Sequence, residues 1–382
     1  MFKAPLKTIL SVLIVSQLVA CQSTNSNQEL ATFEATKGQE VFKSFEEGDL
    51  EWVALGNLAP TQMNIGLKQN AYKLGRWEKE PKKMFEELCE TYGMRGSVVD
   101  FNDATANAQD PDSFQCKQPR NKEGQLTKDA TGQLRAMDAI TPVYVAPNGE
   151  LYITDGHHTN SRFYDMQGGG KHLPVLVRVV KNLSELESME QFWAFMNSNK
   201  NVYLLDNGQT INYADLPKNL GAKGPDNLQG MGNDEFRAVT YYTRDIGWDK
   251  GEAASIPFLE YYWAEEVRPS FTITGNEGIT EYAQTVLNIT NYMVDLSDDH
   301  PLGDSGKTTK ELGKMDVLPF DSVQGVIETT ICEWDKEKAA EGKMKLGKLG
   351  WAFYHQGIAI EDFPIPCNNP NDYAQRYDLA NK

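Results

Sequence analysis

Residues 140–162 read ITPVYVAPNGELYITDGHHTNSR, and this stretch decides the fold that we predict. Its first part holds two runs rich in β-branched and aromatic side chains, residues 140–145 and 151–154. The tetrapeptide APNG at 146–149 lies between them, and Pro, Asn and Gly are typical of tight turns. We therefore predict a β-hairpin.

The residues after the hairpin predict a helix and a further strand. Asp155 and Gly156 precede a predicted helix over 157–166, because Asp-Gly is a common helix start. An apolar run at 173–180 then predicts a strand. Strand, helix and strand in this order indicate a compact α/β unit.

Helical spacing of apolar residues dominates on both sides of this unit. Ser184 and Glu187 have the pattern of a capping box, which places a helix start at residue 184. The helices predicted from these patterns span 67–77, 81–92, 184–196, 234–245, 255–267, 279–296 and 322–339. The predicted fold class is therefore α+β, with a mixed α/β core followed by a largely helical C-terminal half.

The composition limits the kind of ligand that the chain binds. In 382 residues, 37 Lys and Arg stand against 54 Asp and Glu, which gives a net charge of −17. Affinity for nucleic-acid backbones comes largely from cationic side chains, so bulk nucleic-acid binding is not expected. A site for a phosphate-containing ligand must therefore be a local concentration of positive charge. The length suggests two or three units, with a boundary near Pro269.

The N-terminus has the features of a targeting segment. Lys3 and Lys7 precede an apolar stretch that is too short to span a bilayer comfortably. The sequence LVAC at 18–21 resembles the lipobox of bacterial lipoproteins, in which the cysteine is acylated and becomes the mature N-terminus. By this resemblance, residues 1–20 are a lipoprotein signal peptide and Cys21 anchors the chain to a membrane. The alternative is a plain signal peptide with an incidental cysteine.

Polar residues follow Cys21 and predict a flexible tether over 21–45. Gln22 occupies the position where Asp favours inner-membrane retention in the familiar enteric pattern. We therefore expect an outer-membrane lipoprotein that faces the periplasm.

Four further cysteines suggest disulfides, because an even number in an oxidising compartment favours pairing. They are Cys89, Cys116, Cys332 and Cys367, and they allow three pairings. Our hypothesis is the pairing of neighbours in the sequence, Cys89 with Cys116 and Cys332 with Cys367. The alternative is that these cysteines are buried and free.

Two adjacent histidines, His157 and His158, follow the hairpin at a helix start. Backbone N–H groups at such a position favour an anion, Gly156 permits its close approach, and Arg162 lies one turn further on. Histidine serves as a general acid, a general base or a metal ligand near neutral pH. The alternative is structural, with one histidine hydrogen-bonded, the other solvated, and Asp155 acting as a helix cap.

At these residues the chain resembles the ParB/sulfiredoxin superfamily, specifically its divergent ParB-like nuclease branch with an Asp-Gly-His-His motif. The resemblance implies a ParB/sulfiredoxin-like domain over 46–268, followed by a mostly helical extension of unknown role over 269–382. It also implies a phosphate-binding pocket between the Pro-Thr-Gln segment and the glycine-containing turn. The matching residues are Val53, 58–62, 74–76, 153–162, 234–237 and 257–268.

The first functional hypothesis is hydrolysis of a phosphodiester or related phosphate ester at the Asp-Gly-His-His turn. One histidine is expected to act as the base and the other to stabilise negative charge. Asp155 is expected to orient a histidine or to hold a divalent metal, whose identity the sequence leaves open. The predicted catalytic residues are His157, His158 and Asp155, and the predicted ligand-binding residues are Gln62, Arg76, Gly156, Thr159 and Arg162.

The chain also departs from its relatives at the turn. Sulfiredoxins have a catalytic cysteine where this chain has His157, so cysteine phosphotransfer is not carried over. Partition proteins bind triphosphate with arginines that are replaced here by His158 and Thr159. The second hypothesis is therefore a noncatalytic envelope lipoprotein, which binds an anionic ligand at this turn or another envelope protein through its helical half.

Overall fold

The computed structural model of the protein describes residues 40–94, 96–117, 126–128, 132, 134–320, 322–333, 345–359 and 362–363. The predicted signal peptide, Cys21 and Cys367 lie outside these described residues. Phe42 falls within the predicted tether but is buried in the same hydrophobic cluster as Val53. Packing therefore begins before the predicted tether ends.

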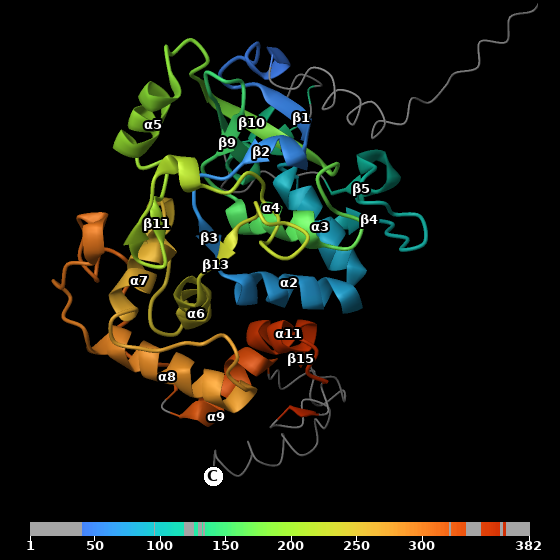
Figure 1. Ribbon diagram of the computed structural model, residues 1–382. Helices are drawn as coiled ribbons and strands as arrows, with labels where there is room; N and C mark the ends of the chain where they lie inside the picture. Colours follow the sequence, from blue (N-terminus) through green and yellow to red (C-terminus); the bar gives the residue numbers. More distant parts are fainter. Residues whose placement is uncertain are drawn as a thin grey trace, which may run out of the picture.

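Figure 1 shows a mixed sheet at one end of the molecule and a group of helices at the other. The strands are β1 (Leu50–Ala54), β2 (Leu58–Ala59), β3 (Asn64–Ile65), β4 (Val98–Val99), β5 (Gln115–Cys116), β6 (Leu126–Lys128), β7 (Leu134–Ala136), β8 (Thr141–Val145), β9 (Leu151–Ile153), β10 (Pro174–Asn182), β11 (Leu205–Asp206), β12 (Gln209–Thr210), β13 (Gly232–Asn233), β14 (Cys332–Glu333) and β15 (Lys345–Leu346). The α-helices are α2 (Leu67–Lys79), α3 (Pro81–Thr91), α4 (His157–Asp165), α5 (Met189–Ser198), α6 (Glu235–Thr243), α7 (Leu259–Val267), α8 (Ile279–Asp295), α9 (Val323–Val326) and α11 (Lys348–His355). Short helical turns are η1 (Leu55–Asn57), η2 (Pro111–Ser113), η3 (Met137–Ala139), η4 (Tyr213–Asp215), η5 (Gly251–Ser255), η6 (Gly303–Ser305) and the π-helical η7 (Ile327–Ile331). The predicted α+β class is confirmed.

The main sheet has the strand order β1-β10-β8-β9-β2. The pair β8 and β9 is antiparallel and is the predicted hairpin, while β10 is the predicted strand that lies parallel to β8. In the hairpin turn, Gly149 has a φ of 82° and its N–H donates to the Ala146 carbonyl at 2.8 Å. The turn-forming residues of the sequence therefore make the turn that was predicted.

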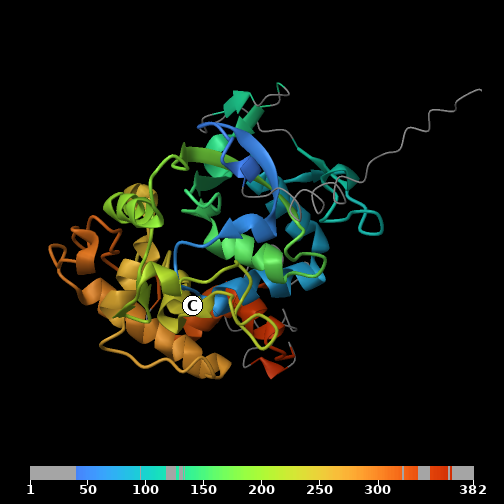
Figure 2. The same ribbon diagram turned by 45° about the horizontal axis from the view of Figure 1, so that its top comes forward.

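The two faces of the sheet are covered by different helices, because successive side chains along β8 and β9 point to opposite faces. Tyr144 and Tyr152 face each other across the hairpin, and they pack against Phe195 and Trp193 of α5, respectively. Their neighbours Val143 and Ile153 are also paired and point to the opposite face, into the cluster formed with α2, α3 and α4. Figures 1 and 2 show α5 on one side of the sheet and α4 on the other.

Three predicted helix boundaries are wrong. The helix predicted to start at residue 255 is α7, which starts at Leu259 after the short turn η5. The helix predicted to start at Ser184 is α5, and it starts after Ser188, whose hydroxyl accepts from the Gln191 N–H at 3.4 Å. The helix predicted over 322–339 ends at Ile331, because the chain then enters β14, which pairs with β15. Of the helices in the described part of the chain, none is long and apolar enough to cross a bilayer.

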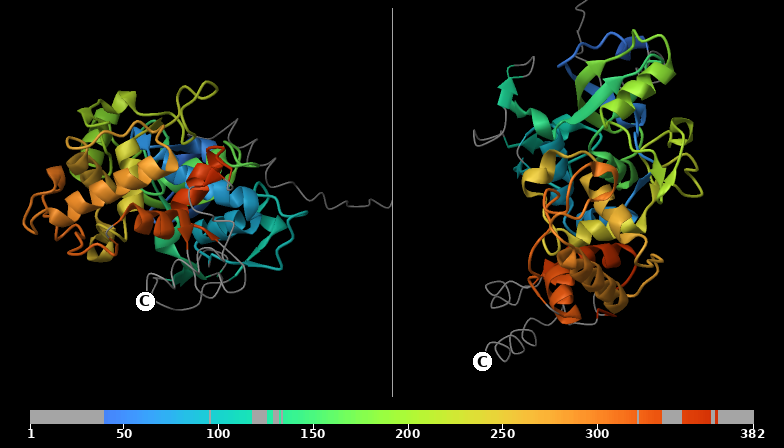
Figure 3. Two further views of the ribbon diagram at one scale, coloured as in Figure 1. Left: turned by 90° about the horizontal axis from the view of Figure 1, so that it is seen from below. Right: turned by 90° about the vertical axis from the view of Figure 1, so that its left-hand side faces the viewer.

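The C-terminal helices share a hydrophobic core with the preceding residues. Tyr72 of α2 and Phe353 of α11 belong to one buried cluster, although the predicted boundary at Pro269 lies between them. Figures 1 and 3 show α11 directly against α2. A Cβ atom at Gly75 would clash with the carbonyl oxygen of Trp351, so glycine allows the two helices to approach this closely. The extension therefore completes the core that α2 begins.

The predicted disulfide between Cys89 and Cys116 is present and joins α3 to β5, with 5.5 Å between the two Cα atoms. Cys332 is also disulfide-bonded. Because Cys367 lies outside the described residues, its pairing with Cys332 stays a prediction.

Candidate functional site

The Asp-Gly-His-His turn connects β9 to α4. Gly156 precedes α4 with a φ of 82°, a left-handed conformation that other residues rarely adopt. The Asn160 side chain stabilises this geometry, because its Nδ2 donates to the Gly156 carbonyl and to Thr141 Oγ1, both at 3.1 Å. The motif thereby places the N-terminus of α4 at the end of a central hairpin strand. Its partial positive charge favours an anion.

His157 is buried and bonds to the Pro-Thr-Gln segment. The Thr61 N–H donates to His157 Nε2 at 3.1 Å, while the Thr61 hydroxyl donates to the Ile153 carbonyl at 2.8 Å. Burial lowers the pKa of His157 to about 3, so the ring is neutral at physiological pH. Because Nε2 accepts a backbone proton donor, the single ring proton is on Nδ1.

His158 makes the same kind of contact further along the chain. The Gly66 N–H donates to its Nε2 at 3.0 Å, just before α2 begins. Burial, and then the positive charges of Arg237 and Arg162, hold the pKa of His158 well below its usual value. Both histidines therefore anchor residues 61–66 to α4, and both neutral rings carry a donor proton on Nδ1.

A cleft of about 500 Å³ opens around this turn. Its lining includes every residue of the turn from Thr154 to Thr159. The cationic side chains that line it are Lys73, Arg162, Lys200, Arg237, Arg244 and Lys250, whereas the carboxylates are Asp155 and Glu260. In a protein of net charge −17, this lining is a local excess of positive charge.

Arg162 is held at one side of the cleft by a buried ion pair. It pairs with Glu87 of α3, and its Nη2 also donates to Thr159 Oγ1 at 2.9 Å. Lys73 contacts the same carboxylate at 2.7 Å. Although burial acts in the opposite direction, Arg162 and Lys73 hold the pKa of Glu87 below its usual value. The carboxylate therefore fixes two cations of the cleft.

Arg237 and Lys250 flank Glu260 elsewhere in the cleft. Lys250 Nζ lies 2.9 Å and Arg237 Nη2 lies 3.7 Å from the Glu260 carboxylate. Although burial opposes ionisation, the two cations lower the pKa of Glu260 to about 2. Glu260 is therefore part of an ion-pair cluster with Arg237 and Lys250. Within the described residues, the Nε atoms of Arg162 and Arg237 are buried and have no hydrogen-bond partner, and both side chains line the cleft.

Comparison with known proteins agrees with the resemblance seen in the sequence. A family model described as "Putative ParB-like nuclease" matches residues 52–269, which is more than half of the chain. The chain belongs to this family. No curated protein matches it. A crystal structure of protein Atu1540 from Agrobacterium tumefaciens is 18% identical, with a TM-score of 0.41, and the similarity covers 68% of this chain and 97% of that chain.

In this member of the ParB-like nuclease family, the predicted site residues divide between two places. Gln62, Gly156, Thr159 and Arg162 line the cleft together with Asp155 and both histidines. Arg76 lies elsewhere, on the face of α2 that points to another pocket, and its Nε pairs with Glu80 at 2.7 Å. Asp155 is exposed, and its Oδ1 accepts from the Gly156 N–H at 2.7 Å. The cleft thus has one exposed and one buried carboxylate.

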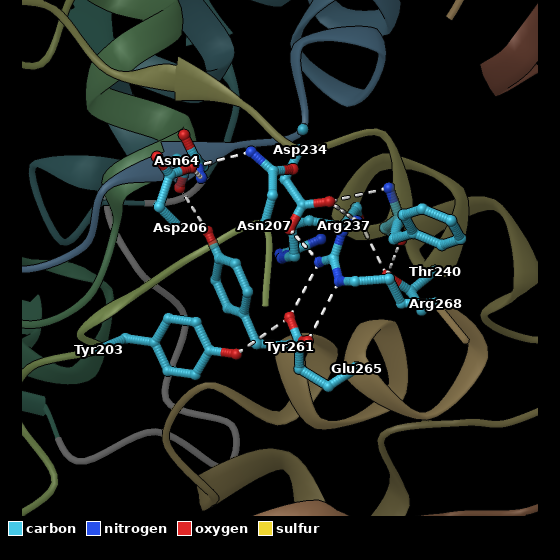
Figure 4. Close-up of polar contacts among 12 residues, drawn as sticks. Asn64, Tyr203, Asp206, Asn207, Asp234, Arg237, Thr240, Tyr261, Glu265 and Arg268 are labelled. Carbon is cyan, nitrogen blue, oxygen red and sulfur yellow. Dashed lines mark hydrogen bonds and ion pairs between the residues drawn. The ribbon is translucent and has the colours of Figure 1, made fainter. Parts of the chain in front are cut away.

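A polar network surrounds the start of α6, and Figure 4 shows it. Asp234 precedes α6 and accepts from the N–H groups of Phe236 and Arg237 at 2.9 and 3.1 Å. It also pairs with Arg268 at 2.7 Å, and Arg268 in turn bonds to Glu265 at 2.8 Å. This network fixes the start of α6 and thereby positions Arg237.

A second arm of the network holds the Pro-Thr-Gln segment. Gln62 Nε2 donates to the Asn64 carbonyl and to the Tyr261 hydroxyl, both at 2.8 Å. Tyr261 also donates to the Asn64 carbonyl, and Asn64 Nδ2 donates to Asp206 at 2.8 Å (Figure 4). Gln62 therefore connects the Pro-Thr-Gln segment to Tyr261 on α7, in addition to its predicted role in ligand binding.

Sequence reasoning missed several cations of the cleft, namely Lys73, Lys200, Arg237, Arg244 and Lys250. Arg237 stands within a segment that resembles the family, whereas Lys73 had no signal besides its place three residues before Arg76. In the described part of the chain, no three His, Cys, Asp or Glu side chains gather in a way that could hold a metal ion.

Proposed function

We propose that the cleft binds a phosphate ester and that the chain hydrolyses a phosphodiester bond there. The observation that carries this proposal is the cationic lining around the N-terminus of α4, in a protein that is otherwise strongly acidic. Cations and helix N-termini are the groups that bind phosphate in proteins. Membership of the ParB-like nuclease family supports the same reaction class.

The roles follow from how each group is held. Arg237 and Arg162 line the cleft, so in this proposal their guanidinium groups bind the phosphoryl oxygens and stabilise the charge that builds up on them. Asp155 accepts a proton from the attacking water. The water oxygen bonds to phosphorus, the bond to the leaving oxygen breaks, and that oxygen takes a proton from solvent.

The histidines act differently from the base first expected. Both Nε2 atoms accept backbone N–H groups and both Nδ1 atoms carry the ring proton, so neither ring has a nitrogen left to accept a proton from water. A group with a pKa of about 3, as in His157, is also a weak base at neutral pH. In this proposal His157 and His158 position the turn, and the proton acceptor is Asp155.

The test is hydrolysis of bis-p-nitrophenyl phosphate and of single-stranded DNA and RNA by the full chain, with Mg²⁺, with Mn²⁺ and with EDTA. Asp155→Asn is expected to lower the rate by about 100-fold or more, the usual contribution of a general base. Asp226→Asn is the matched control, because Asp226 is an exposed carboxylate outside the cleft. Equal rates for Asp155→Asn and the unchanged chain would contradict the assignment.

Anion binding without hydrolysis is the second candidate, and the histidine geometry favours it. Two imidazoles that only position backbone groups are what a binding site needs, whereas catalysis would require the exposed Asp155 alone to act as the base. Binding of thymidine 5′-phosphate that Arg237→Gln weakens, with no turnover of any phosphodiester, would establish this function instead.

We also propose that the chain is a lipoprotein anchored through Cys21 to the outer membrane, facing the periplasm. The disulfide between Cys89 and Cys116 and the disulfide-bonded Cys332 support an oxidising compartment. Cells fed an alkyne fatty acid are expected to label the chain, and Cys21→Ser is expected to abolish the label. Labelling that persists in Cys21→Ser would contradict the anchor.

A further inference from the structure

A second pocket of about 260 Å³ adjoins the cleft. Tyr241 and Arg244 line both the second pocket and the cleft, so the two hollows meet at these side chains. Residues of α2, α6, η7, β15 and α11, and of the segment after α6, form the rest of its wall. The second pocket therefore joins the helical extension to the site of the family domain.

The second pocket also has an excess of positive charge. Arg76, Arg244 and Lys348 line it, against the single carboxylate of Asp245. Lys348 Nζ lies 3.4 Å and Arg244 Nε lies 3.9 Å from that carboxylate. Because the Asp245 side chain is 60% exposed, water screens both pairs, and the cations remain able to bind an anion.

A helix N-terminus adds to this charge, as α4 does in the cleft. Gly347 precedes α11, and both Gly347 and Lys348 line the second pocket. A Cβ atom at Gly347 would clash with the Thr330 carbonyl, so glycine is needed for α11 to start here. The N-terminal end of α11 favours an anion in the same place as the three cations.

Aromatic and apolar groups complete the lining. The Arg244 guanidinium lies 4.8 Å and Lys348 Nζ lies 5.4 Å from the centre of the Tyr241 ring. Ile246 and Trp351 add apolar surface. Cations beside rings and apolar surface are the combination with which proteins bind a phosphate together with its sugar and base.

We infer that the second pocket binds the phosphate next to the one held in the cleft, so that the substrate is a single-stranded oligonucleotide. This inference rests on the proposed function, because it places a phosphate ester in the cleft. A mononucleotide carries one phosphate and occupies the cleft alone. The acidic remainder of the chain confines nucleic-acid binding to these two adjoining pockets.

The experiment measures binding to the full chain carrying Asp155→Asn, so that the probe stays intact. The probes are 5′-fluorescein hexathymidylate, followed by fluorescence anisotropy, and thymidine 5′-phosphate, followed by calorimetry. Lys348→Gln is expected to weaken hexathymidylate binding about three- to tenfold at low salt and to make the slope of log K against log salt shallower by about 0.7. The affinity for thymidine 5′-phosphate is expected to stay the same.

Lys181→Gln is the matched control. The side chains of Lys181 and Lys348 are both 41% exposed, and Lys181 pairs with Glu47 at 3.5 Å, much as Lys348 pairs with Asp245. Lys181 lies on β10, lines neither hollow, and its substitution should change neither affinity. Unchanged hexathymidylate binding in Lys348→Gln, or an equal loss for both probes, would overturn the inference. If Lys348→Gln weakens only hexathymidylate binding but the unchanged chain cleaves no phosphodiester, the proposed hydrolysis is wrong and the inference about the second pocket stands.

Discussion

The cleft and the second pocket are lined by the same kinds of side chains, but the core holds them very differently. At the cleft, the side chains of Arg162 and its partner Glu87 are 6% and 11% exposed. At the second pocket, those of Lys348 and Asp245 are 41% and 60% exposed. Buried charges are poorly screened and tightly positioned, whereas exposed ones are screened by water and salt. Substitutions at the cleft should therefore affect folding and binding together, and those at the second pocket binding alone.

The largest effect on stability is expected for Glu87→Gln. The substitution leaves Arg162 and Lys73 without their shared carboxylate, and removal of one partner of a buried ion pair costs about 3–5 kcal/mol. Urea unfolding measures this loss. Glu47→Gln is the control, because the side chains of Glu47 and its partner Lys181 are 54% and 41% exposed, and it should cost under about 1 kcal/mol. Equal costs for the two substitutions would remove the contrast between buried and exposed pairs.

The next effect concerns ligand binding at the cleft. Arg237→Gln removes a buried guanidinium, and the affinity for thymidine 5′-phosphate is expected to fall by about 10- to 100-fold, the worth of a hydrogen bond to a charged group. Calorimetry gives the affinity, and circular dichroism checks the fold. Arg178→Gln is the control, because Arg178 lies on β10 outside the cleft, and its Nε donates to the Met137 carbonyl at 3.2 Å. A loss as large in Arg178→Gln would mean that the effect is not local.

A pH dependence is expected for the turn. Unfolded His157 binds a proton near pH 6.5, whereas the folded ring does so only near pH 3, so protons favour the unfolded chain as the pH falls through this window. Neutral His157 therefore contributes its full share to the free energy of unfolding above pH 6.5. This share falls by about 2 kcal/mol between pH 6.5 and pH 5, since one pKa unit is worth about 1.4 kcal/mol. Chemical unfolding at pH 7 and pH 5 measures this decline.

His157→Gln is the control for the pH dependence, because glutamine keeps an acceptor near the position of Nε2 without a titrating group. The variant should lose less stability than the unchanged chain between pH 7 and pH 5. An identical decline in both proteins would show that other groups account for it.

The smallest effect is expected at the second pocket. Lys348→Gln should change the free energy of unfolding by under about 0.5 kcal/mol, because its ion pair with Asp245 is exposed. Thermal unfolding measures this change. A loss of more than about 1 kcal/mol in the free energy of unfolding would show that the ion pair of the second pocket contributes to folding. The contrast drawn here between the two pockets would then be wrong.

Much of the fold could be predicted because it depends on neighbours in the sequence. The hairpin of β8 and β9 follows from its turn residues, and the start of α4 follows from Gly156. The start of α5 could not be read in the same way. Both Ser184 and Ser188 can cap a helix, and the structure has the cap at Ser188.

The site was predicted in place but not in full. The turn was predicted to lie at a helix start, where the structure has it, yet adjacency in the sequence does not reveal which atoms the histidines contact. His157 and His158 bond to Thr61 and Gly66, which stand 96 and 92 positions away from them. Arg76 was expected with these residues, but α2 turns it toward the second pocket.

By itself, the sequence determined the features that arise within short stretches of chain. These are the hairpin, the glycine-capped helix and the net charge of −17, whereas the sequence left three cysteine pairings open and the structure shows the one between Cys89 and Cys116. Only the tertiary structure decided which cations line the cleft, because they come from α2, α4 and α6 and from the segments around Lys200 and Lys250. It also decided the protonation of the histidines, since burial sets their pKa and burial exists only after distant segments pack together.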